Sequence, residues 1–380
     1  MIFGTVTSAS DLPKAMIMAR SVKKYMPRSK VVVGIIEDKI PESALRFPYF
    51  NEVILMKHIT TYTIYYKFFF QYTLQEAIRS CKAPIMKYIY YKYTDEDIMV
   101  YLDADMKVLG PFDELPAIVK ENPITVTGHF IYPETFDPDG MAEIRKLGLL
   151  HPGIVALNRH PSAEKYLLWW SKISDHHGYY DHEKNRFADQ DWLDLSHLFF
   201  DEVYTLRHAG YNVSSLNLIE RWNIDRIGED LYVINDQPLR CLQLSPDLLL
   251  ASSWIEPEKG KIYSDLYIQY LNHVIELGLS DMDKKPWSYS LFSSGEPISD
   301  ETKRIFLKNY MKNPEIENPF MLSNAYFNIE LDSQKTDIIP NPHLPQKIIQ
   351  KQNKAIQISR TKARRVKINA SRKKRIRRSG

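Results

Sequence analysis

Short apolar runs alternate with amphipathic segments along the first 110 residues of the chain. The run KVVVGII at 30–36 is continuously apolar, which is typical of a strand buried on both faces. After the first run, Asp11 and Pro13 precede spaced apolar residues, as at the start of a helix. Strands that alternate with helices favour a mostly parallel sheet with helices on both faces. Strands are expected at 2–7, 30–36, 52–56 and 98–103, and a helix over 64–80.

The alternation becomes looser after residue 110. Strands are expected at 124–128, 153–157, 203–206, 231–234 and 239–244, and helices at 162–173 and 189–199. A helical pattern follows from about 260 to 312, and apolar periodicity fades from 333 onward. We therefore expect an α/β domain with a Rossmann-like sheet over 1–250, a helical C-terminal extension over 251–332, and a linker with a disordered basic tail over 333–380.

Composition narrows the class of protein. The apolar fraction of 44% is ordinary for a globular chain and too high for a disordered one. Cys81 and Cys241 are the only cysteines, which excludes a disulfide framework and a zinc site built on thiolates. The N-terminus does not resemble a signal peptide, and no window is apolar enough for a transmembrane helix. We expect a cytoplasmic protein.

Basic residues are concentrated at the C-terminus. Residues 359–380 contain eleven Lys and Arg and no acid, although the net charge of the chain is only +3. Such a tail can hold a protein at an anionic membrane surface, and it can also bind nucleic acid through phosphates. Because the tail lacks the aromatic residues that stack on bases, we expect peripheral membrane attachment rather than nucleic-acid binding.

The strongest chemical signal is Asp103-Ala104-Asp105 at the end of the apolar run 98–103. In an extended chain, residues two apart point to the same side, so the two carboxylates share one face. Ligands of open α/β sheets bind at the carboxyl ends of strands. Two hard oxygen ligands there predict a site for Mg²⁺ or Mn²⁺ with positions left open for phosphate oxygens.

A D-x-D after a strand also occurs in phosphatases of the haloacid dehalogenase type. There the first Asp is a nucleophile, the motif usually lies on the first strand, and Thr or Val stands two places after the second Asp. Here Lys107 holds that place and three expected strands precede the motif. The phosphatase reading is therefore disfavoured.

The chain resembles glycosyltransferases of the GT-A fold, in particular family 8-like enzymes related to glycogenin and the lipopolysaccharide galactosyltransferases. The resemblance rests on the order of several segments over about residues 1–250. These segments are YYKFFFQYTLQEA, IMVYLDADMKVLGPFDEL, LLHPGIVALNRHPSAEKYLLWW, FADQDWLDL and GYNVSSLNLIER. The resemblance implies a GT-A catalytic domain that transfers a hexose from a nucleotide sugar, with a UDP-sugar expected, to a glycan, a lipid-linked or a protein acceptor.

The resemblance also implies roles for residues of the donor site. Asp103 and Asp105 would hold the metal that bridges the diphosphate of the donor. Lys67 matches a basic residue that contacts the phosphates or the acidic motif, and it could equally be a solvated helix lysine. The loop with Thr7, Ser8 and Asp11 matches the part that holds the nucleobase and ribose, although Asp11 could simply cap a helix.

Asp189 and Gln190 match positions that face the anomeric carbon of the donor in the resembled family. Retention of configuration is favoured through the resemblance, and it needs no dedicated base on the opposite face. If the reaction inverts, Asp189 or Asp191 would be the base. Helix capping is the alternative role for Asp189.

The chain departs from the family at one metal ligand. A C-terminal His usually completes the metal site, and Gln243 stands where we expect it. A Gln carbonyl oxygen can bind a hard cation, more weakly than imidazole binds Mn²⁺. This departure keeps an alternative open, in which an inactive body of the same fold serves as a membrane-associated or nucleic-acid-associated adaptor through its basic tail.

Overall fold

A computed structural model describes residues 1–59, 65–132, 148–181, 186–187, 190–278, 286–311 and 313–329. Residues Met1–Phe327 form one compact unit, and Asn328–Gly380 form a second. The linker and basic tail expected over 333–380 lie outside the described residues. The boundary expected near residue 250 stays a prediction.

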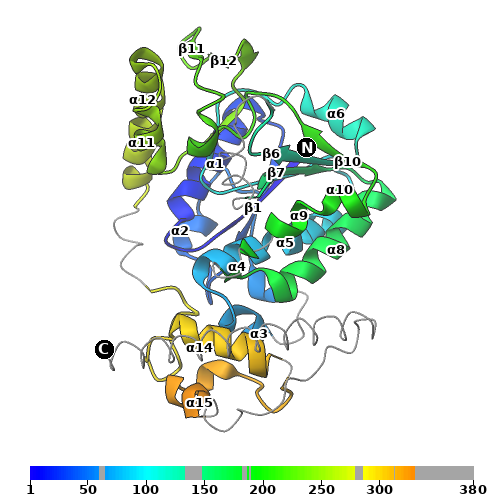
Figure 1. The fold of residues 1–380 in the computed structure, drawn as a ribbon, viewed down its shortest axis with the longest axis vertical. Helices are drawn as coiled ribbons and strands as arrows, with labels where there is room; N and C mark the ends of the chain where they lie inside the picture. Colours follow the sequence, from blue (N-terminus) through cyan, green and yellow to red (C-terminus); the bar gives the residue numbers. More distant parts are fainter. Residues whose placement is uncertain are drawn as a thin grey trace, which may run out of the picture. The chain divides into compact units, whose positions relative to one another are not determined.

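The centre of the first unit is a seven-stranded sheet with the strand order β10-β6-β7-β4-β1-β2-β3. Neighbouring strands run parallel except at β7, which is antiparallel to both β4 and β6. The predicted fold class, α/β with a mostly parallel sheet flanked by helices, is confirmed (Figure 1). The strands are β1 (Ile2–Thr7), β2 (Lys30–Ile35), β3 (Glu52–Leu55), β4 (Met99–Leu102), β6 (Ile124–Gly128), β7 (Leu150–Leu157) and β10 (Val203–Leu206).

Alternating side chains of the strands pack into two hydrophobic cores, one on each face of the sheet. Ile2 and Tyr101 face the core that includes helices α5 (Lys82–Lys92) and α8 (Pro161–His177). Phe3 faces the opposite core, with α1 (Leu12–Tyr25) and α6 (Leu115–Glu121). Because both faces are covered, the central strands β1, β2 and β4 are buried along almost their whole length, as the apolar run at 30–36 predicts for β2.

The aromatic stretch expected as one helix over 64–80 forms two helices, α3 (Tyr65–Phe70) and α4 (Leu74–Ser80). Thr73 separates them because its hydroxyl accepts from the Glu76 amide while the Glu76 carboxylate accepts from the Thr73 amide. This capping box starts a new helix. Helix α5, which follows directly, was not expected from the sequence. The helix expected at 189–199 is likewise divided into α9 (Gln190–Leu193) and α10 (Ser196–Phe199).

Shorter strands lie outside the central sheet. β5 (Met106–Val108) pairs antiparallel with β14 (Cys241–Gln243). A three-stranded sheet has the order β11-β12-β13, and β8 pairs with β9. These strands are β8 (Tyr180–Asp181), β9 (Arg186–Phe187), β11 (Ile224–Arg226), β12 (Tyr232–Ile234) and β13 (Gln237–Pro238).

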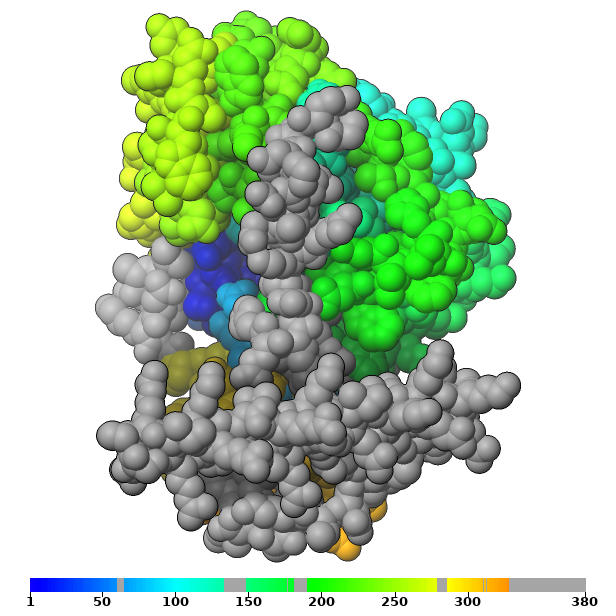
Figure 2. Space-filling view, viewed as in Figure 1, coloured from blue at the N-terminus to red at the C-terminus, as the bar shows by residue number. Residues whose placement is uncertain are grey.

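The helices after residue 245 pack on the sheet domain. α12 (Pro257–Glu276) packs against both α1 and β11, and in Figure 2 its yellow-green surface lies above the blue surface of the N-terminal residues. None of the helices in the described ranges is long and apolar enough to cross a membrane. The remaining helices are α2 (Glu42–Leu45), α11 (Asp247–Ser252), α12 (Pro257–Glu276), α14 (Asp300–Ile305) and α15 (Asn324–Ile329), with short 3-10 turns at Met56–His58, Ser215–Asn217 and Pro319–Met321 and a π-helical turn at Phe306–Tyr310.

Candidate functional site

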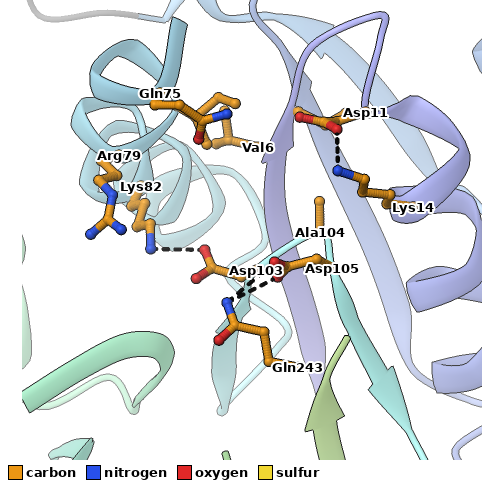
Figure 3. Close-up of a pocket in the computed structure, with 12 residues that line it drawn as sticks. Val6, Asp11, Lys14, Gln75, Arg79, Lys82, Asp103, Ala104, Asp105 and Gln243 are labelled. Atoms are coloured by element: carbon orange, nitrogen blue, oxygen red, sulfur yellow. Dashed lines mark hydrogen bonds and ion pairs between the residues drawn. The ribbon is translucent and has the colours of Figure 1, made fainter. Parts of the chain in front are cut away.

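A cavity of about 170 Å³ opens at the carboxyl end of β1 and β4. We call it the acidic pocket. Its walls come from the β1–α1 loop, from α4 and α5, from the D-x-D turn and from β14 (Figure 3). The pocket brings together five residues that the sequence marked: Thr7, Asp11, Asp103, Asp105 and Gln243. The other residues that line it are Val6, Lys14, Gln75, Ile78, Arg79, Lys82 and Ala104.

The two carboxylates of the motif are held by a tight turn between β4 and β5. The Met106 amide donates to the Asp103 carbonyl over 3.0 Å, which closes the turn. The Asp103 amide donates to the Gly153 carbonyl over 3.0 Å, which anchors the turn on β7. A Cβ at Gly153 would lie 2.6 Å from both the His151 ring and the Met106 methyl group, so a larger residue there would have to displace these side chains. Both acidic side chains line the same pocket, although they reach it from a turn and not from the extended strand that the prediction assumed.

Lys82 on α5 supplies the cation beside the first carboxylate. Its Nζ lies 2.8 Å from Oδ1 of Asp103 and donates to the Pro152 carbonyl over 3.1 Å. The Tyr101 hydroxyl donates to the same Asp103 oxygen over 3.0 Å. The Lys82 side chain is only 2% exposed, so this pairing is shielded from water and its geometry is fixed.

Asp105 is bound from the opposite side by Gln243. The pairing of β14 with β5 sets Gln243 opposite Met106. The Gln243 amide nitrogen then lies 3.2 and 3.3 Å from the two Asp105 oxygens. Burial, and after it the negative charge of Asp103, raise the pKa of Asp105 to about 6. The ionised pair is therefore costly in the folded protein until positive charge enters the pocket.

The β1–α1 loop forms the far wall of the acidic pocket. Asp11 occupies the N-cap position of α1, but its side chain makes no capping hydrogen bond. It pairs instead with Lys14 over 2.5 Å. Thr7 lines the pocket, whereas Ser8 does not; the Ser8 hydroxyl bonds to the Ser10 hydroxyl over 2.8 Å. Figure 3 shows the ion pair of Asp11 and Lys14 across the pocket from Lys82 and Arg79.

The residues of the pocket fit a divalent cation. Asp103 and Asp105 offer hard carboxylate oxygens to a cation, and the pKa of Asp105 is raised first by burial and then by the negative charge of Asp103. Gln243 stands at the position of a third ligand, but it now presents its amide nitrogen to Asp105. A rotation of this amide by half a turn would offer its oxygen to a cation instead. Within the described ranges, no group of three or more His, Cys, Asp or Glu could hold a metal ion by itself.

Several predicted site residues are not brought to the acidic pocket. Lys67 does not line it, and its Nζ donates to the Asn313 carbonyl. Gln190 is buried, and its amide nitrogen donates to the Leu150 carbonyl over 2.9 Å. Asp191 does not line the pocket either, and Asp189 lies outside the described residues. The roles of Lys67, Gln190, Asp191 and Asp189 stay predictions.

A buried histidine pair consists of His129, directly after β6, and His151 on β7. The rings of His129 and His151 are 4.7 Å apart, and the Gln190 amide nitrogen lies 2.6 Å from Nε2 of His129. Burial is the main cause that lowers the pKa of both rings. For His129 the next cause is the His151 ring. For His151 the next causes are the positive charges of Lys82 and Arg79, and its pKa falls to about 3. Both imidazoles are therefore neutral at physiological pH, and neither can serve as a charged proton donor.

Three cations of the acidic pocket, Lys14, Arg79 and Lys82, were not predicted from the sequence. The start of α5 does carry a signal, because Pro84 favours a first helical turn and Ile85, Met86 and Ile89 have helical spacing. Nothing in the sequence distinguishes Lys82 from its neighbour Lys87, because only the packing of α5 under β4 turns Lys82 toward Asp103.

No protein-family model matches the chain, and no curated protein matches it. Several solved structures resemble it. The galactosyltransferase LgtC, in complex with donor and acceptor sugar analogues, is 13% identical with a TM-score of 0.41, over 71% of this chain and 96% of LgtC. The glycosyltransferase GlyE of Streptococcus pneumoniae is 15% identical with a TM-score of 0.39, over 77% of this chain and 66% of GlyE. Mouse xyloside xylosyltransferase 1 is 16% identical with a TM-score of 0.33, over 56% of this chain and 86% of that enzyme.

These structures are glycosyltransferases, as the sequence motifs led us to expect. At such low identity and TM-score an activity does not carry over from one protein to another. The residues of the acidic pocket have to support any function on their own.

Proposed function

We propose that the chain is a metal-dependent glycosyltransferase that uses a nucleotide sugar, with a UDP-sugar expected. The observation that supports this most is the acidic pocket at the carboxyl end of β4, which Asp103 and Asp105 line together with the cations Lys14, Arg79 and Lys82. A pocket with both signs of charge suits a diphosphate bridged by a divalent cation. The metal pairs with the carboxylates and the diphosphate pairs with the basic side chains, so neither set of charges in the pocket is left unpaired.

Each side of the pocket has a distinct role in this proposal. Lys82 holds Asp103 in place and keeps its ammonium group next to the expected diphosphate. Arg79, one turn earlier, can contact phosphate oxygens through its planar fork. On the far wall, Thr7 and Asp11 offer a hydroxyl and a carboxylate to the nucleoside. Bound Mn²⁺ or Mg²⁺ would offset the negative charge of the departing nucleoside diphosphate.

The experiment is a calorimetric titration of UDP with and without Mn²⁺. We expect binding that requires the metal in the native chain and is lost in Asp103→Asn and Asp105→Asn. Asp97→Asn is the matched control, because Asp97 is exposed just before the same strand and does not line the pocket. Metal-independent UDP binding, or unchanged binding in both pocket variants, would overturn the metal role.

A screen of nucleotide sugars then identifies the donor. Selective binding stabilises the folded state by mass action and so raises the apparent melting temperature. At a ligand concentration one hundred times the dissociation constant, the gain in the free energy of unfolding is about 2.7 kcal/mol. If no nucleotide or nucleotide sugar stabilises the protein with any divalent cation, the transferase proposal fails and the adaptor alternative stands. Turnover of a phosphate ester without a sugar acceptor would point to a phosphatase instead.

The basic tail extends the proposal to the location of the enzyme. Its eleven Lys and Arg residues support a cytoplasmic enzyme attached peripherally to an anionic membrane surface, each basic residue contributing about 1 kcal/mol. Co-sedimentation with phosphatidylserine vesicles tests this. The full chain should bind at low salt and a chain ending at residue 358 should not. Equal binding of both would remove the tail from the proposal.

A further inference from the structure

A second cavity, of about 340 Å³, lies along the C-terminal half of α1. We call it the cationic cavity. Its walls are formed by α1, β5, β12 and α12, none of which the sequence analysis connected with a ligand. Cavities that bind small ligands typically measure 300–1,000 Å³, so this one is large enough for a small molecule.

The cationic cavity is separate from the acidic pocket. The two share no lining residue. Lys14 lines the acidic pocket and Lys24 lines the cationic cavity, and a helix rises about 15 Å between them. A ligand in the second cavity would therefore not overlap a donor in the first.

Positive charge dominates the walls of the cationic cavity. Arg20, Lys24 and Lys107 line it, together with a single acid, Asp230. Lys24 is paired with Asp230 over 2.5 Å. The charged ends of the Arg20 and Lys107 side chains have no hydrogen-bond or ion-pair partner within the described part of the chain. Two cationic groups therefore remain for a ligand.

The electrostatics of His273 support this arrangement. This residue of α12 also lines the cavity. Burial lowers the pKa of its imidazole, and the positive charges of Arg20 and Lys107 lower it further, while Glu276 acts in the opposite direction. Both cations therefore lie within electrostatic reach of one ring on the opposite wall. Like charges that converge on a cavity are unfavourable unless an anion enters it.

The rest of the lining is mostly apolar or aromatic, with Ser21 and Gln269 as its uncharged polar members. Ile17, Leu109 and Leu266 form apolar wall, and the rings of Tyr25 and Tyr232 stand at the same cavity. A bare inorganic anion would leave these surfaces unused. The lining fits a molecule that has an anionic group at one end and a carbon skeleton or ring at the other.

We propose that the cationic cavity binds a small phosphate monoester. The dianionic phosphate pairs with the guanidinium group of Arg20 and the ammonium group of Lys107, and the organic part packs against Tyr25 and Tyr232. Arginine suits this role because its planar fork matches two phosphate oxygens. The site goes beyond sugar transfer and does not depend on it.

The test is a calorimetric titration with glycerol 3-phosphate at constant ionic strength, in EDTA so that no metal occupies the acidic pocket. We expect saturable binding in the native chain, and binding weakened roughly tenfold or more in Arg20→Gln and in Lys107→Gln. Two further arginines give the controls. Arg28→Gln changes an exposed residue just beyond the same helix, and Arg79→Gln changes the acidic pocket.

The controls decide where the phosphate binds. Binding that survives in Arg28→Gln and Arg79→Gln but not in the two cavity variants supports the proposal. Binding lost in Arg79→Gln and kept in Arg20→Gln places the phosphate in the acidic pocket and overturns it. Absence of saturable binding in the native chain also overturns it. Unchanged far-ultraviolet circular dichroism and an unchanged melting temperature without ligand confirm that each variant is folded.

A phosphate monoester can be a soluble metabolite or the headgroup of phosphatidic acid. Flotation with vesicles that contain phosphatidic acid distinguishes these sources. If Arg20→Gln weakens flotation relative to Arg28→Gln, the ligand is a lipid headgroup. If both variants float equally while only Arg20→Gln loses glycerol 3-phosphate, the ligand is soluble.

Discussion

Nζ of Lys82 lies 2.8 Å from Oδ1 of Asp103, and this pair joins helix α5 to the acidic turn at the end of β4. The lysine is almost fully enclosed, whereas the aspartate is 18% exposed at the pocket. The cation thus holds the carboxylate from behind and leaves one side of it open to a ligand.

We expect Lys82→Gln to weaken metal-dependent UDP binding roughly 10- to 100-fold, because a buried charge-assisted bond to Asp103 is lost. Lys87→Gln, on the same helix but away from the pocket, should leave the affinity unchanged. Calorimetry at a fixed Mn²⁺ concentration measures both. Equal affinities in the two variants would show that Lys82 only supports the fold.

Asp105→Asn should raise the stability of the metal-free protein at pH 8. The folded state raises the pKa of Asp105 from 3.8 to about 6, so it binds the proton more tightly than the unfolded state does. The free energy of unfolding therefore falls as the pH rises from about 4 to 6, and the loss persists above pH 6. Removing the charge should recover roughly 1–3 kcal/mol at pH 8 and little at pH 4.

Urea denaturation in EDTA at the two pH values measures this difference, with Asp97→Asn as the exposed control. A stability gain of the same size at pH 4 and pH 8 would contradict the electrostatic explanation.

Replacing Gln243 with His should strengthen Mn²⁺ binding, because imidazole nitrogen is a better ligand for this ion than an amide oxygen. We expect an affinity at least several-fold higher for Gln243→His and lower for Gln243→Ala. Manganese binding followed by electron paramagnetic resonance gives both values. If the alanine variant binds Mn²⁺ as tightly as the native chain does, Gln243 does not contribute to the metal site.

Lys303 gives a prediction on stability at alkaline pH. Burial against α3 and α4 lowers its pKa from 10.5 to about 8, while its Nζ donates to the Tyr72 carbonyl over 2.7 Å. Between these two pKa values the unfolded chain holds the proton and the folded chain does not, so this group makes stability rise with pH from about 8 to 10.5.

Lys303→Met should abolish that rise, which is worth about 3 kcal/mol at most. Lys308→Met changes an exposed lysine nearby in the chain and should keep the rise. Denaturation curves between pH 7 and 10.5 compare the variants. A slope in Lys303→Met that equals the native slope would refute the assignment.

The central sheet was predictable because its strands are buried on both faces. A run such as KVVVGII at 30–36 can satisfy that environment only as a strand, and the structure has β2 there. The shared position of Asp103 and Asp105 was also predicted, but the strand period is not the reason for it, because both residues lie in the turn after β4 and not in the strand itself.

The rest of the site depends on contacts between distant segments. Lys82 and Asp103 are far apart in sequence and meet only because α5 packs beneath β4. Lys67 was as good a candidate from the sequence. The helix break at Thr73 separates α3 from α4, and the ammonium group of Lys67 donates to the Asn313 carbonyl instead of reaching the acidic pocket. A single sequence does not rank these lysines, because both have the same local chemistry.

The contact between Gln243 and Asp105 spans 138 residues, and β14 reaches β5 only at the end of the α/β region. A nascent chain that has emerged from the ribosome only as far as β7 contains Asp103 and Asp105 but not yet Gln243. At about 5–20 residues per second, completion takes roughly 7–28 s longer than synthesis of the acidic turn itself. During translation the early half of the protein would therefore lack the complete metal site that we propose.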